Sequence, residues 1–349
     1  MKAVVIYNKE DFRYEDVPDP KPDEEEIVIK VGRCGICAAD PKIYHGSAYF
    51  SKVAYEHAPI VAGHEFIGEV VELGKKAGKK YGLKVGDKAI AEQIVPCGTC
   101  YYCKRGIYNM CDVHKVFGVS GPDGGWAEYM KYPKGSIVWK VPKDLSYDVA
   151  IAIEPLACAI HGVERAKLQL QDTVVLTGCG PIGLLMLQVA KLKHPKCIVA
   201  SDPDENRLGI AKELGADITV NPEKEDIVNI VKDLTNGLGC DVVLEASGYS
   251  KAVKQAIDML RRRGRLMEFG VFTEKVCVDF SIISDVKELE IVGAHLGAYV
   301  YPLAIKYLTE GLVKVDKIIT HNFPLREWKR AIEVSEKHLE NAIKVTMTP

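Results

Sequence analysis

A glycine-rich run between a predicted strand and a predicted helix constrains the fold of this chain most strongly. Gly178, Gly180 and Gly183 follow the apolar stretch 173–177 and open an apolar helical pattern over 182–192. Strands and helices that alternate in this way predict βαβ units on a doubly wound parallel sheet. Further strands are predicted at 198–200, 218–220, 242–244 and 265–269, and further helices at 205–214, 227–234 and 253–260.

The spacing of these glycines is typical of a turn that holds a dinucleotide. Gly178 would form the tight turn, Gly180 would let the backbone approach a pyrophosphate, and Gly183 would pack the helix against the strand. Pro181 and Ile182 stand between the last two glycines, at a helix N-terminus whose dipole favours phosphate. A lone glycine motif is a weak signal, but a strand, a helix and a later acidic residue accompany this one.

That acidic residue is Asp202, which ends the next predicted strand. Its carboxylate would accept hydrogen bonds from the adenosine ribose and would repel the extra phosphate of NADP, so we expect NAD as the cofactor. Arg207 is nearby and could instead help to bind NADP; it also fits a side chain over the adenine or a plain surface charge. Residues after later strands are expected at the nicotinamide end, although each also fits an ordinary turn: Ser247, Val271, His295 and Leu296.

The first 150 or so residues follow a different pattern, of short β segments. Ile27, Ile29 and Val31 alternate on one predicted strand face, and Gly or Pro recurs every 8–12 residues or so. This pattern predicts a barrel-like β domain. A chain of 349 residues is also too long for one ordinary core, so two domains are expected.

Charge and hydropathy exclude several classes of partner. The chain has 46 basic and 48 acidic side chains, so it offers no electrostatic footprint for nucleic acid or an anionic membrane. Its longest uncharged stretch, 173–190, is broken by glycines and a proline, which is unlike a membrane span. The first seven residues are typical of a strand rather than a signal peptide, and we expect a cytoplasmic protein.

Four of the eleven cysteines have the spacing of a structural zinc site: Cys97, Cys100, Cys103 and Cys111. Four thiolates close a tetrahedron around zinc and leave no position for a substrate, so this lobe would pin a surface loop. One alternative is an iron–sulfur cluster, but no proline follows Cys111 and no second cluster motif is present. The other alternative is four unrelated buried cysteines.

A second set of potential metal ligands is scattered along the chain: Cys37, His64, Glu65 and Glu154. A thiolate, an imidazole and carboxylates form a donor set that zinc accepts in catalytic sites, where it can lower the pKa of an alcohol. Each residue alone also fits a structural role: a buried cysteine, a core histidine or a carboxylate at a helix N-terminus. Asp40 and Pro41, after Cys37, look like the N-cap and first position of a short helix.

The combined motifs resemble the zinc-containing medium-chain alcohol dehydrogenases over nearly the whole chain. The carrying residues, beside the glycine and cysteine runs, are Gly35-Ile-Cys37, Gly63-His-Glu-x-x-Gly68, Gly125-x-Ala-Glu-Tyr129 and Glu154-Pro-Leu156. The resemblance implies a GroES-like catalytic domain from residues 1–154 and 294–349, with a zinc lobe at about 95–112. It also implies a Rossmann domain at 155–293, an active-site zinc in the cleft, two zinc ions per chain, and a homotetramer or a homodimer.

The resemblance also implies site roles. Cys37 and His64 would bind the catalytic zinc, while Glu65 and Glu154 would share the remaining coordination. Many relatives place a serine or threonine at position 39 to pass the alcohol proton outward. This chain has Ala39 there, so Lys42, His45, Glu154 or a water chain would carry the proton.

Glutamate at position 154 is similar to the polyol and threonine dehydrogenase branch. Residues 91–96 and 153–161 are most similar to dehydrogenases of four-carbon sugar alcohols such as erythritol and threitol. We therefore expect a zinc enzyme that transfers hydride between a secondary alcohol of a polyol and NAD. The alternatives are a sorbitol- or xylitol-type enzyme, an L-threonine 3-dehydrogenase, and a non-catalytic binding protein of the same fold. Sorbitol dehydrogenases carry an Arg-Tyr pair near position 296, which this chain lacks, and zinc-free quinone reductases lack both cysteine sets.

Overall fold

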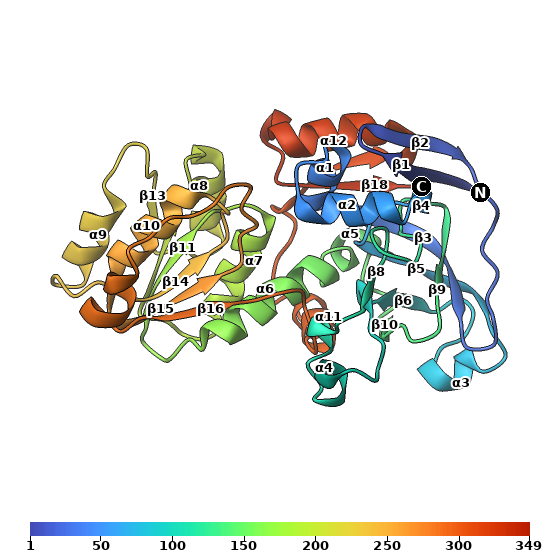
Figure 1. The fold of residues 1–349 in the computed structure, drawn as a ribbon, viewed down its shortest axis with the longest axis horizontal. Coiled ribbons are helices and arrows are strands. Elements are labelled where there is room, and N and C mark those ends of the chain that lie inside the picture. The colour runs from blue at the N-terminus through green and yellow to red at the C-terminus, as the bar shows by residue number, and fades with distance from the viewer. The chain divides into compact units, whose positions relative to one another are not determined.

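The computed structural model describes all 349 residues and divides the chain into two compact units. Unit 1 comprises Met1–Glu154 and Ala298–Pro349, and unit 2 comprises Pro155–Gly297. Both ends of the chain therefore build unit 1, where the red C-terminal strand lies among the blue N-terminal strands (Figure 1). Every helix is too short or too polar to cross a bilayer.

A six-stranded, all-parallel sheet forms the centre of unit 2 (Figure 1). Its order is β13-β12-β11-β14-β15-β16, so the chain winds outward in one direction from β11 and then returns to wind in the other. The strands are β11 (Thr173–Thr177), β12 (Cys197–Ser201), β13 (Ile218–Val220), β14 (Cys240–Glu245), β15 (Leu260–Glu268) and β16 (Glu290–Gly293). In such sheets ligands bind outside the carboxyl ends of the strands, where the winding direction changes.

Helices connect these strands: α6 (Ile153–Ala166), α7 (Pro181–Lys191), α8 (Glu205–Glu213), α9 (Ile227–Leu234) and α10 (Ser250–Met259), with a π turn at Ile282–Val286. Every residue of β11 and β12 is buried, as expected for central parallel strands covered on both faces. Helix α9 buries Ile227 and Val231, one turn apart on the same face. The predicted α/β class with a parallel sheet is confirmed, although α10 begins three residues before the predicted 253–260 helix.

Unit 1 is mainly β structure. Its strands are β1 (Lys2–Asn8), β2 (Asp11–Asp16), β3 (Ile27–Gly35), β4 (Ile60–Val61), β5 (Phe66–Leu73), β6 (Lys88–Ala91), β7 (Ile94–Val95), β8 (Lys115–Val116), β9 (Tyr129–Tyr132), β10 (Val138–Val141), β17 (Ile319–Pro324) and β18 (Lys344–Thr348). Its helices are α1 (Ala39–Tyr44), α2 (Tyr49–Glu56), α3 (Ala77–Tyr81), α4 (Tyr101–Lys104), α5 (Tyr147–Ala150), α11 (Tyr301–Thr309) and α12 (Trp328–Lys337). Short 3-10 turns lie at Tyr108–Met110, Leu325–Glu327 and Leu339–Asn341.

The largest sheet of unit 1 has the order β10-β6-β5-β3-β18-β17, with β9 also paired to β3. Strand β18 pairs with β3 and β17, so the end of the chain completes a sheet that begins near residue 27. Its core packs Phe66, Phe117 and Tyr132 together with aliphatic residues. Val28 is buried along with Ile27 and Ile29, so β3 is covered on both faces, beyond the single buried face that its alternation indicated.

Candidate metal centres and cofactor site

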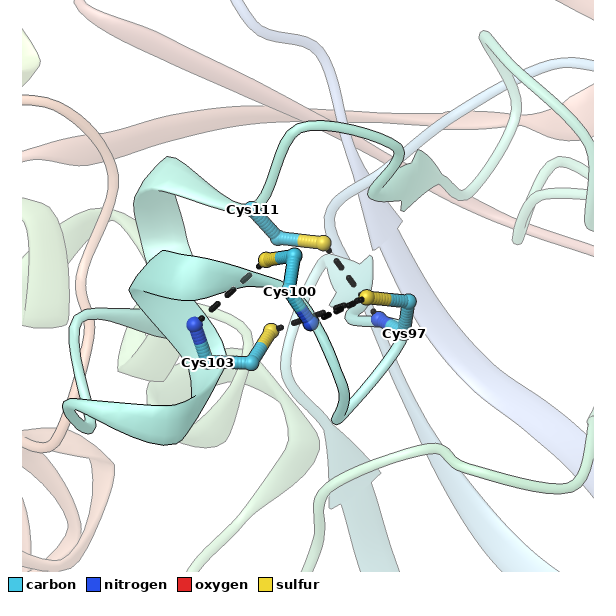
Figure 2. A group of neighbouring side chains, drawn as sticks. All are labelled: Cys97, Cys100, Cys103 and Cys111. Carbon is cyan, nitrogen blue, oxygen red and sulfur yellow. Dashed lines mark hydrogen bonds between the residues drawn. The ribbon is translucent and has the colours of Figure 1, made fainter.

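The four cysteines of the predicted lobe converge in unit 1 (Figure 2). Their sulfur atoms all lie within 4.8 Å of one another, and those of Cys97 and Cys103 are 4.0 Å apart. Cys100 caps the short helix α4, and its sulfur accepts a hydrogen bond from the Cys103 amide. Four thiols at one point are the donor set of a tetrahedral zinc site.

Backbone amides of the lobe donate hydrogen bonds to its sulfur atoms and so stabilise the thiolate form. Hydrogen bonds from the Thr99 backbone and side chain, and from the Cys100 amide, lower the pKa of Cys97 to about 6. The Cys103 amide likewise lowers the pKa of Cys100. Thiolate is the form that binds metal, so these hydrogen bonds favour the metal-binding form of both sulfurs. Burial raises the pKa of Cys103 to about 12, so a bound cation would have to stabilise that thiolate.

One tyrosine anchors the lobe to the rest of unit 1. The Tyr108 hydroxyl donates to the Glu92 carboxylate at 2.9 Å and accepts from the Tyr299 amide at 2.7 Å. The rings of Tyr108 and Tyr299 pack edge to face, 4.5 Å apart. Trp139 also donates to Glu92, at 3.1 Å. Burial nevertheless raises the pKa of Glu92 to about 7.

A second group of donors converges elsewhere in unit 1. One donor atom each from Cys37, His64 and Glu65 lies within 4.8 Å of the others. Cys37 lies between β3 and α1, and the two neighbouring ligands lie between β4 and β5. Nδ1 of His64 is buried without a hydrogen-bond partner. A thiol, an imidazole and a carboxylate at one point fit catalytic zinc, so the residues present suit the ion that the resemblance implies.

Two glycines allow the chain to pack tightly around this centre. A Cβ at Gly35 would lie 2.0 Å from the Glu65 carboxylate. Gly63 has a φ of +93°, and a Cβ there would lie 2.1 Å from the Trp126 ring. The Trp126 indole in turn donates to the Gly35 carbonyl at 3.0 Å. The glycines of the two motifs therefore place the Cys37 and His64 segments side by side.

Two further side chains contact this group of donors, and neither contact was predicted from the sequence. Asp40 lies in the first turn of α1 rather than at its N-cap, which is Ala38, and its carboxylate accepts from the Cys37 amide at 2.7 Å. Its other oxygen is 3.8 Å from Nδ1 of His64. Burial raises the pKa of Asp40 to about 6, which the nearby His64 counteracts. Carboxylates near a metal-binding histidine orient its ring.

The second supporting residue is Lys344, at the start of β18. Its ammonium group is buried, forms an ion pair with Glu65 and donates to the Ile36 carbonyl at 2.9 Å. Burial opposes its charge, but Glu65 raises the pKa of Lys344 above its ordinary value. Glu65 thus has a cationic partner as well as its two neighbours Cys37 and His64.

Glu154 lies outside this group of three donors. It is in the first turn of α6 and is only 6% exposed. Its Oε1 accepts a hydrogen bond from the Gln93 side chain at 2.8 Å. Its charge still acts on the centre, since Glu154 is among the groups that raise the pKa of His64, against the effect of burial.

The two predicted proton-relay side chains have different surroundings. His45 is 3.1 Å from Glu336 on α12 and 3.6 Å from Glu10, so its partners are these carboxylates rather than the Cys37 group. Burial lowers the pKa of Lys42, and the nearby Cys37 counteracts this effect.

The glycine turn of unit 2 has the shape that a pyrophosphate requires. Gly178 has a φ of +91°, where a side chain would be strained. A Cβ at Gly183 would lie 1.9 Å from the Gly178 carbonyl oxygen, so helix α7 packs directly on the turn. A Cβ at Gly180 would meet nothing within 4 Å. Open space at Gly180, at the start of α7 with Pro181 and Ile182, fits a phosphate on the helix N-terminus.

Asp202 lies beside this turn and is 5% exposed. Its carboxylate accepts from the Cys179 amide at 2.7 Å and from the Asp204 amide at 2.9 Å, which fixes its orientation. Arg207 is largely buried, 3.9 Å from Asp204, and its Nη2 is buried without a partner.

The ends of later strands also meet at this turn. A Cβ at Gly178 would lie 2.8 Å from the Ser247 amide, and one at Gly248 would lie 2.9 Å from the Val271 carbonyl. Ser247 donates to the Glu245 carboxylate. Leu296, after β16, has a left-handed φ of +58°, which is uncommon for a leucine. The structure therefore brings Ser247 to the Gly178 turn and places Val271 beside Gly248. His295 directly precedes Leu296.

Comparison with known proteins identifies the family. A family model described as "Alcohol dehydrogenase GroES-like domain" matches residues 23–143, and one described as "Zinc-binding dehydrogenase" matches residues 181–310. The erythritol/L-threitol dehydrogenase of Mycolicibacterium smegmatis is 44% identical over 100% of this chain and 98% of that protein. The L-threonine 3-dehydrogenase of Pyrococcus furiosus is 38% identical over 88% of this chain and 87% of that protein.

A solved structure gives the same result. A zinc-binding dehydrogenase of Sinorhizobium meliloti, bound to NADP, superposes with a TM-score of 0.91 at 30% identity, over 100% of this chain and 99% of that one. Fold and matches together define a zinc- and nicotinamide-dependent dehydrogenase. More closely, the chain belongs to the zinc-containing medium-chain alcohol and polyol dehydrogenases. The predicted family, fold class and enzyme class are confirmed.

Proposed function

We propose that this chain oxidises a secondary alcohol of a four-carbon sugar alcohol, such as erythritol or threitol, with NAD. The alcohol carbon would lose hydride to the nicotinamide, and its oxygen would lose a proton to solvent, giving a ketone, NADH and a proton. The observation that carries the proposal is the convergence of the donor atoms of Cys37, His64 and Glu65 at one point. The matched relative whose name gives these two substrates supports the choice of polyol.

The active protein would bind two zinc ions per chain. The lobe of Cys97, Cys100, Cys103 and Cys111 would hold the structural ion, and Cys37, His64 and Glu65 would hold the catalytic ion. Glu154, whose charge acts on His64, would share that coordination by exchanging with Glu65. The catalytic ion would act as a Lewis acid toward the alcohol. NAD, held by Gly178, Gly180 and Gly183, would accept the hydride.

The protein's own groups would orient the reactants and move the proton. Asp40 holds the Cys37 amide and lies beside His64, so it would fix both ligands. Lys344 would hold Glu65 in place by its ion pair. Because position 39 is alanine, the proton would leave through Lys42, His45, Glu154 or a water chain. The partners of His45 favour Lys42 over it.

Replacement of Cys37 by alanine tests the catalytic ion. We expect the zinc content to fall from two ions to one per chain and kcat to fall by about a thousandfold, because the Lewis acid is worth several kcal/mol. Cys277→Ala, at an exposed cysteine, is the matched control. Near-normal turnover in the Cys37 variant would refute the proposal, and one zinc per wild-type chain would favour the non-catalytic alternative.

The substrate is tested by steady-state kinetics on erythritol, threitol, xylitol, sorbitol and L-threonine. We expect the highest kcat/KM for a four-carbon polyol. A preference for L-threonine would instead favour the alternative that the Pyrococcus relative represents, and a preference for sorbitol or xylitol would favour the hexitol or pentitol alternative.

Asp202 supports NAD rather than NADP, although one solved neighbour binds NADP. Asp202→Ser would remove the charge that accepts from the ribose. We expect kcat/KM for NAD to fall by about 10- to 100-fold, because hydrogen bonds to charged groups are worth roughly 1.5–3 kcal/mol, and the preference for NAD over NADP to shrink. Wild-type kinetics that favour NADP would overturn this choice.

The edge of the unit 2 sheet supports a homo-oligomer. Strand β16 ends the sheet order, so one of its edges is unpaired, and Ile291 on it is 46% exposed. Phe280 and Val286, in the preceding segment, are 74% and 51% exposed. Apolar exposure next to an open strand edge favours pairing with a second copy. We propose a homotetramer in the cytoplasm, with a homodimer as the alternative. Light scattering would measure the molecular mass in solution, and the mass of a monomer would contradict the proposed oligomer.

A further inference from the structure

We propose that Gln93, held by Tyr301, is the positioning residue of Glu154 and fixes how that carboxylate faces the catalytic centre. This inference rests on the proposed function, in which Glu154 takes part in that centre. All three residues belong to unit 1: Gln93 lies between β6 and β7, Tyr301 begins α11, and Glu154 is the last residue of the unit's first segment.

Two hydrogen bonds between side chains and one from a backbone amide join these three residues. The Gln93 amide nitrogen donates to Oε1 of Glu154 at 2.8 Å. The Tyr301 hydroxyl donates to the Gln93 amide oxygen at 2.7 Å. The backbone amide of Gln93 donates to the same Tyr301 hydroxyl at 3.4 Å.

These bonds determine which way the amide points. The Tyr301 oxygen receives the backbone amide of Gln93, so its own proton is directed to the amide oxygen. The amide nitrogen must then be the donor toward Glu154, because a flipped amide would place its oxygen against a carboxylate oxygen. Gln93 therefore offers Glu154 a donor in a fixed direction, and Oε1 of Glu154 is engaged as an acceptor.

Burial makes this arrangement rigid. Gln93 is 1% exposed, Tyr301 is fully buried and Glu154 is 6% exposed. Water therefore has little access to replace either side-chain bond, and loss of the amide would leave a buried carboxylate with one donor fewer. The adjacent Glu92 faces Tyr108 and Trp139 instead, so the two neighbouring side chains have separate partners.

The orientation of Glu154 affects the Cys37 centre through the charge of its carboxylate. The Glu154 carboxylate acts on His64 and on Lys344, the partner of Glu65. A carboxylate held in one orientation would approach the ion in one geometry when it exchanges with Glu65, whereas a mobile one would have no fixed geometry. Groups that orient ligands from behind typically affect metal affinity or activity by about 10- to 100-fold.

The experiment uses the zinc-loaded full chain and the variant Gln93→Met, which keeps the length of the side chain but removes the amide. Zinc release to an excess of chelator is followed optically, and the ion of the catalytic centre is identified as the one missing from Cys37→Ala. We expect that ion to leave about 10- to 100-fold faster and kcat to fall in the same range, with the KM for NAD unchanged. Gln188→Met, at another buried glutamine in α7, is the matched control and should leave release and kcat at wild-type values.

A double-mutant cycle with Glu154→Gln separates this inference from the function on which it rests. If Gln93 acts through Glu154, Gln93→Met adds nothing to Glu154→Gln. An undiminished effect in that background, or wild-type release and kcat in Gln93→Met, would overturn the positioning role. Wild-type behaviour of Glu154→Gln alone would instead refute the role of Glu154 in the proposed function. Should Gln93→Met fold poorly, Tyr301→Phe, which frees the amide to flip, must change release in the same direction or the inference fails.

Discussion

The cysteine lobe draws all its ligands from one short loop, whereas the Cys37 centre draws three ligands from two segments and its countercharge from a third. Cys97 to Cys111 span fifteen residues, and backbone amides of the same loop stabilise the thiolates. The Cys37 centre needs β3, the segment before β5, and β18, where Lys344 lies. The lobe is thus a local structure, and the Cys37 centre depends on the completed sheet.

The two sites also differ in exposure and in whether a charged side chain lies beside the donor atoms. The lobe leaves three of its four cysteines partly exposed, and no acidic or basic side chain pairs with them. In the Cys37 centre, Glu65 is 2% exposed and has a buried cation, Lys344, beside it. We therefore expect loss of the lobe to affect stability more than chemistry, and changes around Glu65 to depend on whether zinc is bound.

The largest expected effect comes from breaking the lobe. Cys100→Ser should release one zinc and lower the free energy of unfolding by about 5 kcal/mol or more, the range reached when a metal site is lost. Activity per folded molecule at low temperature should change little. Calorimetry and metal analysis measure both, with Cys277→Ser as the control. Retention of both ions with an unchanged melting temperature would contradict the separation of roles.

A smaller effect is expected at Lys344. Lys344→Met would leave the Glu65 carboxylate buried without its cation, which typically costs about 3–5 kcal/mol. Bound zinc would supply a positive charge in its place, so we expect the zinc-free protein to lose more stability than the zinc-loaded one. Thermal unfolding with and without chelator measures the difference, and Lys344→Arg should retain most of the stability. Equal losses in both states would show that Glu65 does not approach the ion.

The smallest effect concerns Glu92, which joins the lobe to the body of unit 1. Burial raises the pKa of Glu92 to about 7, so the folded state favours its neutral form. Stability from this carboxyl is present at low pH and is lost as the pH rises through about 7. Glu92→Gln should remove that loss, worth at most about 3 kcal/mol between pH 5 and 8. Urea unfolding across this range tests it, and equal pH dependence in both proteins would refute it.

Local spacing explains what the sequence could predict. The strands and helices of unit 2, the four-cysteine lobe and the Cys37, His64 and Glu65 set all follow from residues that are close in sequence or carry distinctive chemistry. The α/β class and the dehydrogenase family were predictable on the same basis. The spacing of the glycines also predicted that Gly180 would leave room for a phosphate, and a Cβ at Gly180 would indeed meet nothing within 4 Å.

The residues that support the candidate sites could not be predicted from local spacing. Lys344 and Glu65 are 279 residues apart, and Gln93 and Tyr301 are 208 apart, so no spacing signals either pair. Lysine and glutamine are also ordinary surface residues, and only burial in the sheet gives them a role. Asp40 was assigned to the helix cap because its contact with His64 arises from tertiary packing.

The pairing of Glu65 with Lys344 also sets an order of events during synthesis. The lobe can close as soon as Cys111 has emerged, because its whole ligand set is then available. Glu65 must wait for a lysine 279 residues later, which takes roughly 15–55 s at about 5–20 residues per second. Throughout that interval the nascent chain already has the four thiols of the lobe, while the Glu65 carboxylate lacks its lysine partner.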